Sequence, residues 1–208
     1  RGIDMTLSEF DNEIRKDHNV VCGCDEAGRG PLAGDVFAAA VIFDKDTVIE
    51  GINDSKKLTA KKREELFDEI MEKAVDFSIQ TATVEEIEDI NILNAAMLAM
   101  KRAVEDMDTK PDVCLIDGNK TLEGLECPAI AVVKGDAKSQ AVAAASILAK
   151  VARDRYMEQM AEQYPEYRFE KHKGYGTKLH YQMIDQYGPC GIHRMSFLKK
   201  YYAKKNGH

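Results

Sequence analysis

Four acidic side chains fall where predicted strands end or a predicted helix begins. They are Asp25, Glu26, Asp117 and Asp136. Ligands collect at strand ends in open α/β sheets, and carboxylates gathered there raise each other's pKa unless a cation offsets their charge. Mg²⁺ prefers carboxylate oxygens and water, and two ions roughly 3.5–4 Å apart can activate a water and stabilise the leaving oxygen of a phosphodiester. The pattern is therefore compatible with metal-dependent phosphodiester hydrolysis.

Each acid also has a structural explanation that the residues alone leave open. Asp136 could cap the helix that follows it. Asp117 precedes Gly118-Asn119 and could begin a turn. Asp25-Glu26 closes an apolar strand, and neighbours in a regular strand face opposite sides, so a shared site would require the chain to bend at Glu26.

The elements that must position these acids follow from hydrophobic periodicity and turn residues. Apolar or alternating segments predict strands at residues 19–26, 34–43, 76–82, 112–117 and 129–133. Helical spacing predicts helices at residues 59–74, 83–107 and 136–163, with two shorter ones from Thr177 onward. Neighbouring strands followed by strands that alternate with helices predict an α/β domain, with a mixed sheet covered by helices.

Composition and charge narrow the class of function. The 208 residues include no apolar stretch near the ~20 residues that cross a bilayer, so we expect no membrane partner. The net charge is −7, yet residues 168–208 carry nine Lys or Arg against two acids, which suits phosphate contacts or a solvated helical face. The five cysteines are odd in number and lack C-x2-C spacing, which predicts free thiols in a reducing cytoplasm.

Six blocks of sequence resemble the ribonuclease HII family, in the family's order. They are Asp-Glu-Ala-Gly-Arg-Gly-Pro-Leu-Ala-Gly (25–34), Asp-Ser-Lys-Lys-Leu (54–58), Ile-Asp-Gly-Asn (116–119), Lys-Gly-Asp-Ala-Lys-Ser (134–139), His-Lys-Gly-Tyr-Gly-Thr (172–177) and Gly-Ile-His-Arg-Met-Ser-Phe (191–197). The resemblance covers nearly everything from Val20 to Phe197. It implies a ribonuclease H-like mixed sheet flanked by helices, with a catalytic domain over residues 1–163. Residues 164–208 would form a basic, helical C-terminal extension packed on the same domain.

The resemblance also implies an activity and a metal. The family's members are endonucleases that cut the phosphodiester 5′ of ribonucleotides, in RNA–DNA hybrids and where a single ribonucleotide is embedded in DNA, leaving 3′-hydroxyl and 5′-phosphate ends. Two divalent ions, Mg²⁺ or Mn²⁺, would serve the catalysis. Carried over by position, the catalytic and metal-binding residues would be Asp25, Glu26, Asp117 and Asp136.

Substrate-binding residues follow from the same resemblance. The Gly28-Arg29-Gly30 loop would recognise the ribose 2′-hydroxyl mainly through backbone groups, which glycine allows to approach closely, with Arg29 on a phosphate. Tyr175 would pack on the deoxyribose after the ribonucleotide, and Lys56 would contact phosphate. A tight turn, a loop anchor and a solvated lysine are the respective alternatives.

Two other classes of function stay open from the residues alone. A non-catalytic nucleic-acid-binding module on this fold would gain nothing from four acids near phosphate. A metal nuclease for a DNA junction would leave the Gly-Arg-Gly loop unexplained. We expect a monomer. The tail Leu198–Tyr202 weakly resembles sliding-clamp-binding peptides, with Met195 in place of the usual Gln, and it equally fits an amphipathic helix.

Overall fold

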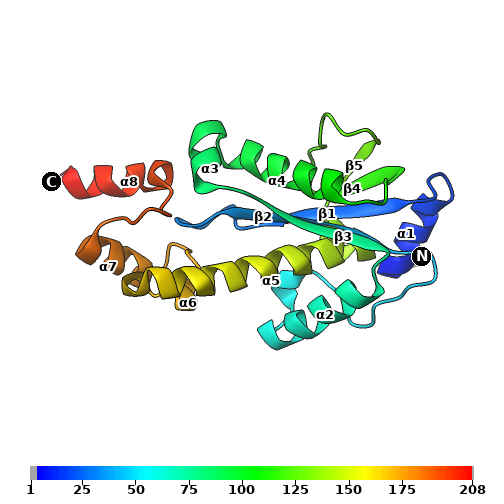
Figure 1. The fold of residues 1–208 in the computed structure, drawn as a ribbon, viewed down its shortest axis with the longest axis horizontal. Coiled ribbons are helices and arrows are strands. Elements are labelled where there is room, and N and C mark those ends of the chain that lie inside the picture. Colours follow the sequence, from blue (N-terminus) through cyan, green and yellow to red (C-terminus); the bar gives the residue numbers. More distant parts are fainter. Residues whose placement is uncertain (1–3, 208) are drawn as a thin grey trace.

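The computed structural model describes residues 4–207, and a five-stranded mixed sheet lies at its centre (Figure 1). The strands are β1 (Val21–Ala27), β2 (Val36–Ile42), β3 (Asp76–Ala82), β4 (Val113–Asp117) and β5 (Ala129–Val132). Their order across the sheet is β3-β2-β1-β4-β5. The first three strands pair antiparallel, whereas β4 runs parallel to β1 and β5 runs parallel to β4. The parallel half therefore brings the carboxyl ends of β1, β4 and β5 to one edge.

Helices cover both faces of this sheet (Figure 1). One face carries α3 (Val84–Ile90) and α4 (Ile92–Asp106), and the other carries α2 (Ala60–Lys73) and α5 (Gln140–Gln163). Helix α1 (Leu7–Arg15) packs on the same side as α5. Beyond α5 come the helices α6 (Phe169–His172), α7 (Lys178–Tyr187) and α8 (Met195–Asn206). Three single 3-10 turns complete the helical structure of the described chain, at Ser55–Lys57, Gly135–Ala137 and Pro165–Tyr167.

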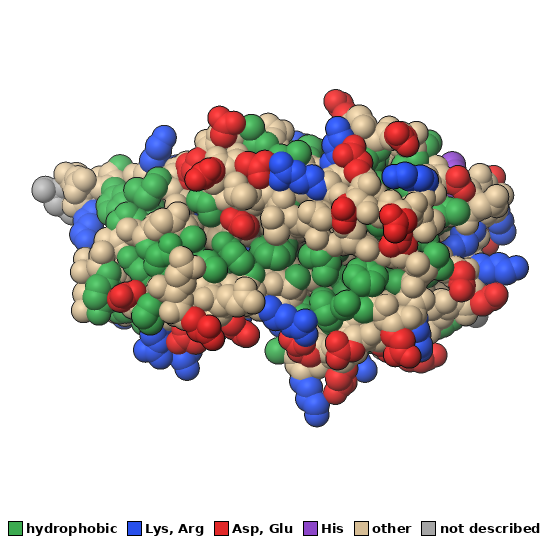
Figure 2. Space-filling view, viewed as in Figure 1, with side chains coloured by type: hydrophobic (Ala, Val, Ile, Leu, Met, Phe, Trp, Pro, Cys, Tyr) green, Lys and Arg blue, Asp and Glu red, His purple; other side chains and the backbone are tan. Residues whose placement is uncertain are grey.

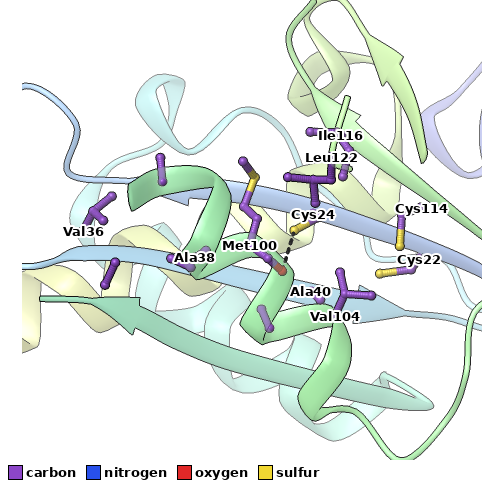
Figure 3. Packing of buried hydrophobic residues seen from close by; sticks show 14 of the residues in the cluster. Cys22, Cys24, Val36, Ala38, Ala40, Met100, Val104, Cys114, Ile116 and Leu122 are labelled. Carbon is purple, nitrogen blue, oxygen red and sulfur yellow. Dashed lines mark hydrogen bonds between the residues drawn. The ribbon is translucent and has the colours of Figure 1, made fainter. Parts of the chain in front are cut away.

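The central strands are apolar on both faces and separate two cores. Cys22 and Cys24 of β1 pack beneath α4, and the Sγ of Cys24 lies 3.8 Å from the Met100 carbonyl oxygen (Figure 3). On the opposite face, Ala39 and Val41 of β2 pack against α2 and α5. Charged side chains of both signs lie over the outer helices in Figure 2, and apolar side chains show along the middle of that view.

Helix α5 lies unusually close to β1 because both elements supply small residues at the contact. A Cβ on Gly23 would lie 2.2 Å from the backbone carbonyl carbon of Ala141, so this strand position admits only glycine. Residues 143–145 of α5 are all alanines and all fully buried. The close approach fixes the N-terminal end of α5 relative to the acidic end of β1.

The predicted strands are all present, with ends that differ by at most two residues. The long helix predicted at 83–107 is wrong, because it is two helices separated by Asn91, whose φ of 71° breaks the first and whose side chain caps the second. The helix predicted from Asp136 begins instead at Gln140, with Ser139 as its N-cap. Helix α1 was not predicted. No helix within residues 4–207 has the length and apolar character needed to span a membrane.

Candidate active site

Parallel pairing of β1 with β4 sets two of the predicted acids side by side. Cys24 is in register with Ile116, and the next residue of each strand is an aspartate, Asp25 and Asp117. Asp136 follows β5, in the 3-10 turn before α5. One carboxylate oxygen from each of these three aspartates lies within 4.8 Å of the other two. The strand-end argument therefore located three acids that the fold brings together.

The turn that carries Asp136 is held against Asp117 rather than serving as a cap. The Asp136 backbone N–H donates to Asp117 Oδ1 at 3.2 Å. The Ser139 hydroxyl caps α5 by accepting from the Val142 N–H at 3.2 Å. Asp136 is therefore not needed as a helix cap. Asp117 is the last residue of β4.

Glu26 lies in the same cleft but outside the group of three. Strand β1 stays paired with β2 as far as Ala27, so the expected bend at Glu26 is absent, and Glu26 lines the cleft without it. The Glu26 backbone N–H donates to Asp25 Oδ1 at 2.8 Å, and its carboxylate lies 3.4 Å from the Arg29 guanidinium. Glu26 thus sits at the rim, between the buried acids and the Gly28–Gly30 loop.

Burial and mutual repulsion perturb these carboxylates strongly. Asp25 is 5% exposed, and burial, then the nearby charges of Glu26 and Asp117, raise its pKa well above the usual value. Burial raises the pKa of Asp136 to about 6, with further contributions from Asp117 and Asp54. Ionised acids this close and this buried are disfavoured unless a cation neutralises them. The donor set, carboxylate oxygens alone, is the one that hard divalent cations prefer, so the residues fit such an ion.

One cleft of about 530 Å³ contains every site residue that the sequence predicted. These residues are Asp25, Glu26, Gly28, Arg29, Gly30, Lys56, Asp117, Asp136 and Tyr175. Tyr175 is 39% exposed, and its ring centroid lies 5.6 Å from the Lys150 ammonium. Lys150 also lines the cleft and was not singled out from the sequence. Lys150 belongs to α5, which begins shortly after the turn that carries Asp136. Its place on that helix was the only signal in the sequence that could have marked it.

Buried histidines hold the loop that presents Tyr175. The His180 Nδ1 lies 2.9 Å from the Tyr175 carbonyl oxygen, and its Nε2 lies 2.9 Å from the Nε2 of His193. Burial lowers the pKa of His180 to about 4 and that of His193 to about 3, so both rings are neutral at pH 7. These histidines support the loop and do not line the cleft.

The comparison with known proteins decides the family. The family model for ribonuclease HII matches residues 22–200. The chain belongs to the ribonuclease HII family. Ribonuclease HII from Caldicellulosiruptor saccharolyticus is 53% identical over 199 residues, which cover 95% of this chain and 97% of that protein.

Solved structures agree with this assignment. The crystal structure of ribonuclease H2 from Pyrococcus horikoshii OT3 matches with a TM-score of 0.73 at 28% identity, covering 90% of this chain and 100% of that one. A chain in the structure of the PCNA:RNase HII complex from Archaeoglobus fulgidus matches with a TM-score of 0.70 at 25% identity, covering 85% and 94%.

Two predictions made from the sequence are confirmed by these findings. The six blocks correctly indicated the ribonuclease HII family, which makes the protein a hydrolytic endoribonuclease. The predicted fold, a ribonuclease H-like mixed sheet flanked by helices with a helical C-terminal region, is also correct. The divalent-metal dependence of the family agrees with the carboxylate cluster of Asp25, Asp117 and Asp136.

Proposed function

We propose that the protein hydrolyses the phosphodiester on the 5′ side of ribonucleotides, both in RNA–DNA hybrids and where one ribonucleotide is embedded in duplex DNA. The products would carry 3′-hydroxyl and 5′-phosphate ends. The observation that carries this proposal is the single cleft shared by the buried aspartates and the Gly28–Gly30 loop. Reactive groups and a ribose-recognising backbone then meet the same nucleotide.

The acids supply the binding site for the cofactor. Asp25, Asp117 and Asp136 would hold divalent cations, Mg²⁺ or Mn²⁺, with Glu26 as a further ligand at the rim. When two ions are bound, they activate the attacking water and stabilise the leaving oxygen. The carboxylates must be ionised to act as ligands, so their raised pKa values make cation binding weaken as the pH falls.

The Gly28–Gly30 loop supplies the selectivity for ribose. Gly28 has a φ of +94°, and a Cβ there would lie 2.1 Å from the Arg153 Nε, so the backbone adopts a conformation open only to glycine. Within residues 4–207, the backbone N–H groups of Arg29 and Gly30 have no hydrogen-bond acceptor. They are donors available to a 2′-hydroxyl oxygen, the group that distinguishes RNA from DNA.

Three side chains at the mouth of the cleft would orient the strand. The Arg29 side chain is 52% exposed and suits a phosphate, as does the exposed Lys56. Tyr175 offers its ring to the deoxyribose that follows the ribonucleotide. These contacts would fix which phosphodiester faces the acids.

The C-terminal tail supports a helical role better than a clamp-binding one. Leu198 is fully buried in α8 and packs with Leu32 and Ile184, so it is not free to act as the anchor of a clamp-binding peptide. We propose a monomeric, cytoplasmic enzyme in which this tail is an ordinary amphipathic helix.

The decisive experiment is cleavage of a DNA duplex with one ribonucleotide, beside an all-DNA duplex, with Mg²⁺ or with chelator. We expect one cut, on the 5′ side of the ribonucleotide, only with metal. The all-DNA duplex should react at least ~10⁴-fold more slowly. A site built to hydrogen-bond a 2′-hydroxyl is left with unpaired polar groups when that hydroxyl is missing. Comparable cutting of both duplexes would refute the proposed function.

A further inference from the structure

A buried arginine from the C-terminal region lies directly behind the Gly28–Gly30 loop. Arg194 is fully buried, and its guanidinium donates to backbone carbonyl oxygens along the connection between β1 and β2. The acceptors are the carbonyls of Gly28 at 2.7 Å, Arg29 at 3.1 Å, Pro31 at 3.0 Å and Gly34 at 2.9 Å. Within residues 4–207 Arg194 forms no salt bridge, so its hydrogen-bonding capacity is spent on this backbone.

Neighbouring contacts hold three further carbonyls of the same segment, those of Leu32, Ala33 and Asp35. The Arg194 N–H donates to the Leu32 carbonyl at 2.8 Å, and the Gly34 N–H donates to the Ile192 carbonyl at 2.9 Å. From α5, Arg153 donates to the carbonyls of Ala33 at 2.8 Å and Asp35 at 3.1 Å. Most carbonyl oxygens of the β1–β2 connection, with Gly30 the exception in the described chain, therefore accept hydrogen bonds from Arg194 or Arg153.

The backbone N–H groups of the same loop lie on the side that faces the cleft. Gly28, Arg29 and Gly30 line the cleft, and the N–H groups of Arg29 and Gly30 have no protein acceptor among the described residues. Behind them, burial lowers the pKa of Arg194 to about 9, so its guanidinium stays protonated at neutral pH. Asp35 lies close enough for its charge to act on both Arg153 and Arg194. The loop therefore presents donors to the substrate while its acceptors are held by a buried positive charge.

We infer that Arg194 is a positioning residue for ribose selectivity. By holding four carbonyls at once, its planar fork fixes the loop so that the free N–H groups keep one distance from the acids. A lysine cannot reproduce this, because three donors on one nitrogen cannot reach four separated carbonyls. The inference rests on the proposed function, since it names the device that makes the loop selective for a 2′-hydroxyl.

The test measures binding selectivity rather than activity alone. In an Asp136→Asn background, which prevents cleavage, dissociation constants are measured for the single-ribonucleotide duplex and for the all-DNA duplex. Arg194→Lys should reduce the affinity ratio between them by at least tenfold, with affinity for all-DNA within twofold of the parent. Ile70→Ala is the control for stability, because Ile70 is fully buried in α2 outside the cleft.

The possible outcomes separate the two claims. A parent protein with no preference for the ribonucleotide would overturn the proposed function itself. A parent preference that Arg194→Lys retains would overturn only the role of Arg194. Parallel loss of affinity for both duplexes, with a melting temperature lowered as in Ile70→Ala, would also overturn it and leave Arg194 a purely structural residue. Should Arg194→Lys not fold, Arg194→Gln is measured instead, because its single amide nitrogen can donate to at most two of the four carbonyls, and an unchanged ratio there rejects the inference.

Discussion

At the level of single residues, the acids of the cleft work against the fold that holds them. Asp25 and Asp136 are both nearly buried, and their pKa values are raised mainly by burial and then by neighbouring carboxylates. Without a cation, the ionised forms are therefore a cost to the folded state. Such a cost is expected where a protein keeps charges for binding rather than for stability.

Replacement of one acid by its amide should separate these two roles. Asp136→Asn should abolish cleavage and raise the melting temperature in chelator by a few degrees, since relief of repulsion is worth on the order of 1 kcal/mol. The exposed Asp108 offers a matched control, and Asp108→Asn should change neither quantity. Turnover and thermal melts of both variants provide the check. Near-normal turnover by Asp136→Asn would exclude it as a metal ligand.

The residues of the site differ in how far their roles could be foreseen from sequence. Asp25 and Asp117 end apolar strands, so a local pattern marks them as candidates. Arg194 carries no such mark, because its partners are backbone carbonyls 160 or more positions away in the chain. A buried guanidinium that bonds backbone needs no complementary acid in the sequence. Only the tertiary fold reveals it.

At the level of elements, helix α1 acts on the site through the start of α5. Asp11 is 1% exposed and accepts from the Ser139 hydroxyl at 2.6 Å and the Ala141 N–H at 2.9 Å. These contacts tie α1 to the turn that carries Asp136. A signal for α1 was present in the sequence, because Thr6 and Glu9 form a capping box at its start. The helix is short and rich in charge, so periodicity alone did not predict it.

The pH dependence of stability should reveal the buried Asp11. Burial raises its pKa from 3.8 to about 6. Above pH 6 the folded protein bears the cost of an ionised buried group; as the pH falls from 6 toward 3.8, the folded state takes up a proton before the unfolded chain does, and this cost disappears. Asp11→Asn should therefore be more favourable relative to wild type at pH 8 than at pH 4.5, by up to about 2 kcal/mol.

Urea unfolding of both proteins at the two pH values measures this difference. The comparison uses the change in relative stability with pH, because Asn also alters the hydrogen bonds to Ser139 and Ala141. Asp17→Asn removes an exposed charge just beyond α1 and serves as the control. A relative stability of Asp11→Asn that does not vary with pH would show that Asp11 is not held ionised at a cost.

Local sequence patterns predicted the positions of the strands but not the break between α3 and α4 or the order of the strands in the sheet. Strand positions were predicted within two residues because period-2 and apolar runs are local. The break at Asn91 was missed because the apolar spacing of α3 and α4 continues through it, while the chain turns there by one left-handed residue. The order of strands is a tertiary property. It follows from which apolar faces pack together, as in the pairing of β1 between β2 and β4.

At the level of the whole molecule, the C-terminal region is joined to the sheet by polar and apolar contacts alike. Arg194 bonds the β1–β2 connection, and an isolated bridge pairs Ala33 with His193. Leu198 of α8 packs on Leu32 of the same connection. Both regions therefore contribute to the Gly28–Gly30 loop that is proposed to select ribose. Its free N–H groups belong to the α/β region, and the residues that support it belong to the C-terminal helical region.

We therefore expect the two regions to unfold as one unit. If residues 164–208 lost their structure alone, the β1–β2 connection would lose its four hydrogen bonds from Arg194, and Leu32 would lose its packing on Ile184 and Leu198, so separate unfolding would be costly. Scanning calorimetry should show one transition, with equal calorimetric and van't Hoff enthalpies of roughly 150 kcal/mol for a chain of this length. A chain ending at Gln163 should show no cooperative transition, because the loop would lose both the Arg194 hydrogen bonds and the apolar packing of Leu32. Two resolved transitions in the full chain, or a cooperative melt of the shortened one, would show that the α/β part holds its own loop and that the C-terminal helices form an independent unit.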